Sequence, residues 1–470
     1  MLPTALLLIC AAHTWAQDAP SSAQESARVL RDKQIITASE YDRILTGGSS
    51  GGVEELATIL RNKGVITAVE AASLNPNKIG RVTTDPPVEP ANSNQESERK
   101  LNFYGTLLFN AYFNNSALNN ADIPAFALPN TSSAQKNFGA TARQTRLGLS
   151  YSGSTVAGAK ITGTAEADFF GGEPALANGI NMDVIRMRLA YGRLDWKRFA
   201  VEAGQDWAIF APLNPTSLAE FAVPEFSTSG NLWIRTPQIR TELKNELGER
   251  RTLLWQMAAL DPDIGDNAVA YSTARQPKAG ELGGWPAVET RLAFSAPIGQ
   301  RTATIGVSGH GSPARNMGSI NGVPAARSFT SWGVAADYSV PISTLVSISG
   351  EAYSGRALGL FSGGIGQTLT PLGQPGDRGV GTRGGWLQIQ LNLTKQLQSN
   401  SAYGIDSPVL RDLPAGSRSK NQNYMSNIMY HLSPNLTFAL EWHRFLTDYR
   451  NQPGANHNGD HFNVAAAYTF

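Results

Sequence analysis

The last nine residues, "FNVAAAYTF" (462–470), alternate between two kinds of side chain up to the terminal carboxylate. Phe462, Val464, Tyr468 and Phe470 are apolar or aromatic, whereas the residues between them are small or polar. A period of two is typical of a β-strand whose two faces meet different surroundings. Most chains end in frayed, poorly ordered residues. An alternation that continues to a terminal aromatic ring therefore predicts that the C-terminus belongs to a sheet.

The same period recurs along the chain from residue 101 onward. The segments "LNFYGTLLFNAYFNN" (101–115), "AKITGTAEADFFG" (159–171) and "MDVIRMRLAYGRLDW" (182–196) each set an apolar face against a polar one. We identify sixteen such segments, and the one near residue 400 is the shortest. They begin near residues 101, 141, 159, 183, 197, 238, 252, 287, 302, 329, 344, 384, 400, 421, 436 and 461.

Short and long connections alternate between these segments. The short ones include 153–158, 193–198, 245–250, 296–301, 340–344 and 432–435. The long ones are 116–140, 171–182, 211–237, 261–286, 311–327, 355–383, 406–420 and 449–460. An outer-membrane barrel has short periplasmic turns and longer external loops, whereas a soluble sandwich has no reason for this alternation. The sequence therefore predicts an all-β fold, a transmembrane antiparallel β-barrel of about sixteen strands over residues 101–470, with eighteen strands as the alternative.

Charged residues lie on the polar face of the predicted strands. A charge on the lipid face costs about 2–4 kcal/mol at the middle of the bilayer, so these side chains must face a wet lumen. They are Arg146, Lys160, Glu166, Asp168, Arg186, Arg188, Arg240, Glu242, Glu289 and Arg291. Aromatic residues near strand ends suit the two interfacial girdles of such a barrel. They are Tyr151, Tyr191, Trp196, Phe199, Trp332, Tyr338, Trp386, Tyr424, Tyr430, Trp442 and Tyr468.

The third long connection lies within "AIFAPLNPTSLAEFAVPEFSTSGNLWIRTPQIR" (208–240) and is rich in proline and aromatic residues. Irregular backbone at membrane depth is tolerated where it lines a water-filled space. We expect this loop to fold into the lumen and narrow it; a plain external loop is the alternative. The candidate constriction residues are Asp206, Trp207, Glu220, Glu225, Trp233 and Arg235.

Six inward arginines could attract anions by concentrating positive potential in the channel. They are Arg146, Arg186, Arg188, Arg235, Arg240 and Arg291. The alternative is that neighbouring carboxylates simply neutralise them. Those carboxylates are Glu166, Asp168, Glu202, Glu242 and Glu289.

The N-terminus predicts export. Residues 5–12 form an apolar segment that is too short to span a bilayer, which takes about 20 residues. With "TWA" before Gln17 it fits a signal peptide over residues 1–16. The single cysteine, Cys10, lies inside that segment; lipidation there is the alternative, and Ile9 is larger than the residue usually found before a lipidated cysteine. The mature chain would therefore need no disulfide.

Residues 17–75 contain a repeat. "LRDKQIITASEYDRIL" (30–45) and "LRNKGVITAVEAASL" (60–74) match at an offset of 30 residues. Each copy holds a T-x-x-E capping box, which places helix starts at Thr37 and Thr67. We predict two helical hairpins in the periplasm, serving either as an oligomerising or cell-wall-contacting module or as a spacer. Residues 76–100 are rich in proline and are predicted to be a linker.

Several motifs resemble the DcaP-like trimeric outer-membrane porins. They are "RQTRLGL" (143–149), "AEADFFGG" (165–172), "RMRLAYGRLDW" (186–196), "VEAGQDWAIFAPLNP" (201–215) and "RTPQIR" (235–240). The resemblance covers most of residues 101–470. It implies a homotrimer of sixteen-stranded barrels in the outer membrane of a Gram-negative-type bacterium, in contact with lipid and lipopolysaccharide, with a periplasmic extension and a preference for small anionic solutes such as dicarboxylates. The family's extension is a coiled coil, and here hairpin repeats replace it.

The terminal residues Tyr468 and Phe470 resemble the C-terminal signal that the barrel-assembly machinery reads. Among other classes, nucleic-acid binding is disfavoured by a net charge of +1 without a basic run. His310 and Ser312 could suggest a hydrolase, but no acid partner is evident in the sequence. We therefore expect no enzyme, no metal and no cofactor. The main alternative to a channel is a structural or adhesive outer-membrane barrel with a plugged lumen.

Overall fold

The computed structural model describes residues 22–32, 35–46, 55–61, 63, 99–129, 136–171, 184–264, 277–451 and 457–470. The chain forms two compact units, Met1–Asn94 and Gln95–Phe470. The predicted signal peptide, the helix start at Thr67 and nearly all of the predicted linker lie outside the described residues. Among the described residues, no helix combines the length and the apolar character needed to cross a membrane.

The first unit is helical. It contains α2 (Ser22–Asp32), α3 (Ala38–Thr46) and a helical segment at 55–61. The capping box at the start of α3 is formed as predicted, because the Thr37 amide donates to Glu40 (2.7 Å) and the Glu40 amide donates to the Thr37 hydroxyl (3.3 Å). Lys63 of the second copy pairs with Glu40 at 3.1 Å. One small core packs the first copy against the segment that leads into the second copy. Its residues are Ala27, Leu30, Ile36, Ile44, Leu56, Ala57, Ile59 and Leu60.

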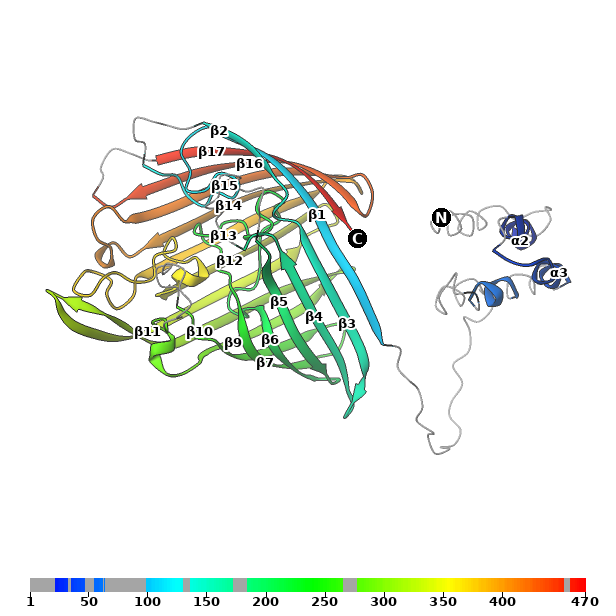
Figure 1. Cartoon of the computed structure of the whole chain (residues 1–470), viewed down its shortest axis with the longest axis horizontal. Helices are drawn as coiled ribbons and strands as arrows, with labels where there is room; N and C mark the ends of the chain where they lie inside the picture. The colour runs from blue at the N-terminus through cyan, green and yellow to red at the C-terminus, as the bar shows by residue number, and fades with distance from the viewer. Residues whose placement is uncertain are drawn as a thin grey trace. The chain divides into compact units, whose positions relative to one another are not determined.

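The second unit is a closed antiparallel barrel (Figure 1). Its strands are β1 (Lys100–Asn114), β2 (Asn137–Thr141), β3 (Arg146–Val156), β4 (Ala159–Asp168), β5 (Arg186–Asp195), β6 (Phe199–Trp207), β7 (Arg235–Glu246), β8 (Thr252–Leu260), β9 (Ala287–Ile298), β10 (Arg301–Ile320), β11 (Val323–Pro341), β12 (Val346–Arg356), β13 (Gly381–Asn392), β14 (Leu397–Pro408), β15 (Arg418–His431), β16 (Leu436–Tyr449) and β17 (His457–Thr469). Short 3₁₀ turns occur at η4 (Glu281–Gly283), η5 (Gly359–Phe361) and η6 (Leu410–Asp412).

These seventeen segments make sixteen barrel strands. β2 and β3 pair with successive parts of β1, from Asn114 back to Lys100, so they are the two halves of one interrupted strand. The other edge of β1 pairs with β17, from Thr106 opposite Thr469 to Asn114 opposite His461, and this pairing closes the barrel. The predicted strand count of sixteen is confirmed, and the uncertain segment near residue 400 is β14.

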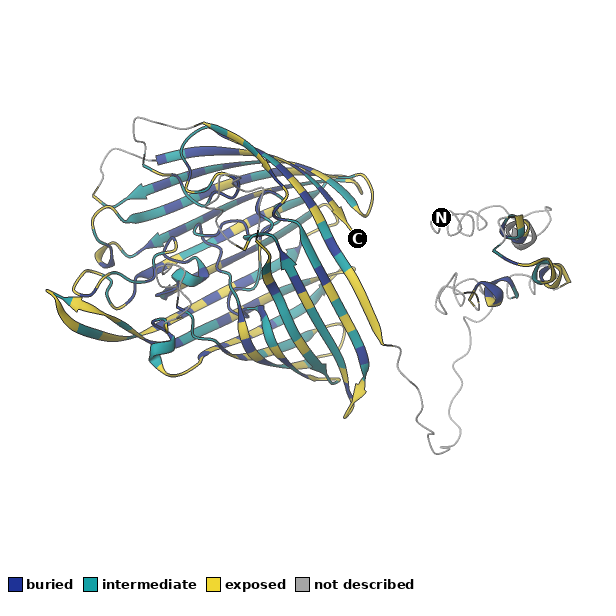
Figure 2. Cartoon of the chain, viewed as in Figure 1, coloured by how far each residue is buried: buried dark blue, intermediate teal, exposed yellow. Residues whose placement is uncertain are grey.

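The barrel is inverted relative to a soluble protein, with apolar side chains outside and polar side chains inside. In β17, Phe462, Val464 and Tyr468 are 46%, 53% and 48% exposed, whereas His461 and Asn463 are buried. The same alternation runs around the wall, and Figure 2 shows it as bands of buried and exposed residues along the strands. A closed barrel leaves no unpaired edge, and its apolar outer face suits lipid.

Two expectations about the wall are wrong. Residues 311–327 are not a long loop: β10 and β11 continue as a hairpin that turns at Asn321 and Gly322, with φ of 50° and 79°. Asn-Gly is the preferred pair for a two-residue turn that needs positive φ at both positions. Trp386 does not belong to an outer girdle, because it is buried on the inner face, where its indole donates to Glu351.

Candidate functional site

The connection between β6 and β7, residues 208–234, lies inside the barrel and is called loop L3 below. Inward-facing side chains from much of the wall bind it through hydrogen bonds. They are Gln144, Glu289, Ser308, Glu351, Gln388, Asn421, Asn423, Asn427 and Glu441. These contacts contradict the alternative of a plain external loop.

The first part of L3 is held through its backbone amides. Glu289 accepts from the amides of Ile209 (3.0 Å) and Phe210 (3.2 Å), and Glu351 accepts from that of Leu213 (2.7 Å). Three prolines in L3 have no amide to donate, so the segment is ill suited to a regular strand. The carboxylates of the wall accept the hydrogen bonds that a neighbouring strand would otherwise accept, so the buried backbone amides remain satisfied.

The middle of L3 is held by Gln144, which lies in the break between β2 and β3 and is fully buried. Its side-chain oxygen accepts from the amides of Phe221 (2.7 Å) and Ala222 (2.9 Å). Its amide group donates to the Ala219 carbonyl (2.7 Å). Gln144 was not predicted from the sequence, in which the only signal is that "TARQT" (141–145) interrupts the alternation.

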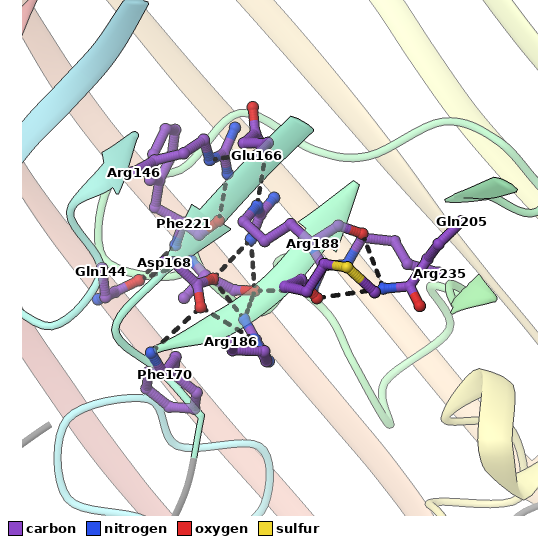
Figure 3. A network of polar contacts seen from close by, with 12 residues as sticks. Gln144, Arg146, Glu166, Asp168, Phe170, Arg186, Arg188, Gln205, Phe221 and Arg235 are labelled. Atoms are coloured by element: carbon purple, nitrogen blue, oxygen red, sulfur yellow. Dashed lines mark hydrogen bonds and ion pairs between the residues drawn. The ribbon is translucent and has the colours of Figure 1, made fainter. Parts of the chain in front are cut away.

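Four of the predicted arginines gather beside L3, and Figure 3 shows Arg146, Arg186 and Arg188 turned toward Glu166 and Asp168. Arg186 donates two hydrogen bonds to Asp168 (3.0 and 2.6 Å). Arg188 donates to Glu166 (2.7 Å) and to Asp168 (2.9 Å). Arg146 is 3.5 Å from Glu166. We call these residues, together with Arg235, the arginine cluster.

The arginine cluster also binds L3. The Ala222 carbonyl accepts from Arg186 (2.9 Å), Arg188 (3.2 Å) and Arg235 (3.4 Å). The Phe221 carbonyl accepts from Arg146 at 3.1 Å. These carbonyls use part of the arginine hydrogen-bonding capacity and bring no compensating charge.

Arg235 is the member of the cluster whose positive charge is least neutralised by carboxylates. It packs over the rings of Trp207 (4.7 Å) and Trp233 (5.1 Å), which stabilise a cation. Within the described part of the chain it forms no ion pair, and its Nη1 has no hydrogen-bond partner there. Within the part of the chain that the structure describes, the four arginines thus have two carboxylates as ion-pair partners, Glu166 and Asp168. These six residues have a formal excess of two positive charges.

A cavity of about 380 Å³ opens next to this cluster. Its lining includes Arg146, Arg188 and Trp207 from the wall and residues 214–218 of L3. A solute of a few heavy atoms in this space would meet two guanidinium groups and an indole ring, with the Glu220 carboxylate also in the lining. The guanidinium fork matches the geometry of a carboxylate.

Arg240 and Arg291 lie outside the cluster and are neutralised. Arg240 contacts Glu202 (2.7 Å), Asp206 (2.8 Å) and Glu242 (3.3 Å). Arg291 pairs with Asp337 at 2.6 Å. Asp337 was not among the predicted site residues. The six arginines are therefore not one ladder. Arg240 and Arg291 are neutralised, whereas the other four outnumber the two carboxylates that pair with the cluster.

Glu289 and His310 belong to an L3 anchor. The expectation that His310 lacks an acid partner is wrong, because its Nδ1 lies 3.2 Å from Glu289, and its Nε2 is 3.4 Å from the Ser331 hydroxyl. Ser331 is buried, and its hydroxyl donates to the Ala357 carbonyl at 3.1 Å. Ser312 donates to the Pro313 carbonyl instead. This arrangement resembles a hydrolase triad in composition, but its hydroxyl is committed to backbone and out of solvent.

The remaining predicted residues, Glu220 and Glu225, lie on L3 and are buried beside His443 of β16. Among the described residues neither forms an ion pair with the arginine cluster, although Glu220 lines the same cavity as Arg146 and Arg188.

The barrel is similar in fold to an outer-membrane channel of known structure. The chain is similar to the outer membrane channel DcaP of Acinetobacter baumannii, with a TM-score of 0.58 and 19% identity over 79% of this chain and 97% of that one. The fold is that of the DcaP channel. An anion-selective porin from Comamonas acidovorans matches at a TM-score of 0.49 and 12% identity, over 79% of this chain and 100% of that one. No protein-family model and no curated protein sequence matches. The resemblance to the DcaP-like porins is therefore confirmed for the fold.

Proposed function

We propose that this protein is an outer-membrane porin, a water-filled channel for passive diffusion of small hydrophilic solutes. The observation that carries the proposal is loop L3, held across a polar, charged lumen by side chains from much of the wall. A loop in this position narrows a channel and places selective groups in the path of a solute. The sixteen-stranded closed barrel and the fold of DcaP support the same reading.

Small anions, including dicarboxylates, are the proposed preferred solutes. The arginine cluster supports this, because its excess of two positive charges lies beside L3 and borders a cavity of about 380 Å³. The constriction would be formed by L3 with Arg146, Arg186, Arg188, Arg235 and Trp207. Asp206, Glu242, Arg240 and Arg291 line the wall in balanced or acidic groups, and we assign them no anion-binding role.

Single-channel recording in a planar bilayer tests the channel proposal. Stepwise currents in potassium chloride, reduced by small dicarboxylates, are the expected result. The absence of steps from folded protein would overturn the proposal and favour the alternative, a structural or adhesive barrel with a plugged lumen. The reversal potential under a salt gradient then tests selectivity, and a shift toward cation selectivity would overturn the anion preference.

The location and partners follow as further parts of the proposal. We place the barrel in the outer membrane of a Gram-negative-type bacterium, in contact with lipid and lipopolysaccharide, as a homotrimer. The helical repeats would lie in the periplasm, where they either contact the cell wall or act as a spacer. Assembly would use the barrel-assembly machinery acting on Tyr468 and Phe470. Catalysis is not proposed, since Ser331 and His310 are committed to backbone and loop anchoring.

A further inference from the structure

Three buried side chains come together where L3 meets β16, outside the arginine cluster. Glu220 and Glu225 lie on L3, and His443 lies on β16; their exposed fractions are 4%, 0% and 0%. One potential ligand atom from each lies within 4.8 Å of the other two. His443 Nδ1 is 3.4 Å from a Glu225 oxygen. Carboxylate oxygens and an imidazole nitrogen are a common ligand set for divalent metals.

Unsatisfied polar atoms lie in this cluster. Among the described residues, Glu220 Oε1, Glu225 Oε2 and His443 Nδ1 have no hydrogen-bond partner. A buried polar atom without a partner costs about 1–3 kcal/mol, and more when it is charged. Three such atoms within one cluster point to a shared ligand rather than to three separate defects.

The second ring nitrogen of His443, Nε2, is held by a carboxylate, as is usual for a histidine that binds a metal. Its Nε2 lies 2.8 Å from Glu441 Oε1, and Glu441 in turn accepts from the Asn427 side chain (3.1 Å) and the Leu218 amide (3.3 Å). A histidine that binds a metal usually donates its second N–H to a carboxylate in this way, which orients the ring. Here the hydrogen bond to Glu441 leaves Nδ1 free to face Glu220 and Glu225.

The charges also favour a cation. Glu220, Glu225 and Glu441 surround one imidazole, and within the described part of the chain no lysine or arginine forms an ion pair with any of them. Buried charges are normally paired or bound to a metal. A divalent cation would supply the missing positive charge.

We propose that Glu220, Glu225 and His443 bind a divalent cation of the zinc class, which ties L3 to β16. Zinc binds nitrogen and oxygen at about 2.0–2.2 Å, so that tetrahedral ligands lie ~3.3 Å apart. The 3.4 Å between His443 Nδ1 and the Glu225 oxygen already matches this value, and the three ligand atoms lie within 4.8 Å of one another. Calcium and magnesium fit less well, because both prefer oxygen ligands throughout. Three protein ligands leave a fourth position for water.

The site is tested by zinc titration of the full-length protein in detergent. The protein is first treated with a chelator and dialysed to remove bound metal. We expect one zinc ion per chain by calorimetry. Binding should weaken at least tenfold in His443→Gln and in the double variant Glu220→Gln/Glu225→Gln. Glu351→Gln is the matched control, since Glu351 is also a buried carboxylate that accepts an L3 amide; it should bind zinc like the wild type. Equal affinity in His443→Gln, or no saturable binding to the wild type, would overturn the proposal.

Zinc-edge X-ray absorption on the wild type gives a test that needs no variant. We expect nitrogen and oxygen ligands with the scattering of a single imidazole. A spectrum with no imidazole, or with two or more, would place the zinc elsewhere and overturn the assignment. None of these measurements depends on ion conduction, so the metal site and the porin proposal can fail independently.

Discussion

Gly105 of β1 and Phe470, the last residue, exchange two backbone hydrogen bonds, of 3.1 Å from the Gly105 amide and 3.0 Å from the Phe470 amide. The Phe470 ring also packs against Phe103, with ring centroids 5.4 Å apart. A Cβ on Gly105 would lie 2.6 Å from the Arg146 carbonyl oxygen and 2.9 Å from the Phe470 ring. The end of the chain is thus fitted into the seam where the barrel closes.

Deleting Phe470 should lower assembly far more than it changes conduction. The deletion removes the final pair of seam hydrogen bonds and an aromatic contact, but no residue of the lumen. The folded fraction, measured by the mobility of unheated samples in gel electrophoresis, should fall severalfold, while pores that do form keep the wild-type conductance. Phe470→Tyr is the control and should assemble normally. Normal assembly of the deletion variant would contradict the prediction.

Arg235→Gln should shift selectivity toward cations. A unit charge about 10 Å from a passing ion is worth about 0.4–1.7 kcal/mol at an effective dielectric constant of about 80 to 20. The charge stabilises an anion and destabilises a cation by this amount, so its removal changes their energy difference by about 0.8–3.4 kcal/mol. The anion-to-cation permeability ratio should therefore fall at least about fourfold, as read from the reversal potential. Arg301→Gln removes the same charge at an exposed turn between β9 and β10, and should leave the ratio nearly unchanged. Similar ratios for both variants would argue against the arginine cluster as the selective element.

Gln144→Ala should loosen L3. The substitution leaves the buried amide of Ala222 and that of Phe221 without their acceptor, at a cost of about 1–3 kcal/mol for each. The free energy of unfolding should fall by about 2–6 kcal/mol for the two amides together, and the single-channel current should become noisier. Gln390→Ala is the control, because Gln390 faces the same lumen but bonds Asn392 rather than L3. A quiet channel from the Gln144 variant would show that L3 does not depend on this anchor.

The capping box of α3 predicts a local pH dependence. The hydrogen bond from the Thr37 amide lowers the pKa of Glu40 below its ordinary value of 4.5. A lowered pKa in the folded state means that the contribution is present above pH 4.5 and is lost as the pH falls through the lowered value. Hydrogen-exchange protection at the start of α3, corrected for intrinsic rates, should therefore be lower at pH 3 than at pH 6. Glu40→Gln should abolish this difference; an unchanged difference would contradict the assignment.

The wall was predictable from sequence because its pattern is local. Each strand meets lipid on one face and water on the other, so the alternation around Phe462 or Leu107 reports orientation directly. The β10–β11 hairpin was missed although Asn321-Gly322 is a strong turn signal, because the long connections elsewhere favoured another loop. Trp386 was assigned to the outside by residue type alone, and only its position in the register shows that it faces inward.

The site was less predictable because it depends on pairings between distant segments. The six arginines share a residue type and a face, but their partners decide which of them keep a net charge, and Asp337 lies on β11, far in sequence from Arg291. The L3 anchors Gln144 and Glu441 are also remote from the loop that they bind. Neither a period nor a spacing along the chain contains this information.

L3 connects distant parts of the barrel wall through hydrogen bonds, from Glu289 and Glu351 to Gln144. The cross-section of the barrel therefore cannot become oval without straining the hydrogen bonds that hold L3. In a bilayer, any lateral pressure that flattens the barrel would act on the same hydrogen bonds that fix the width of the opening. The roundness of the wall and the size of the passage are thus one mechanical property rather than two.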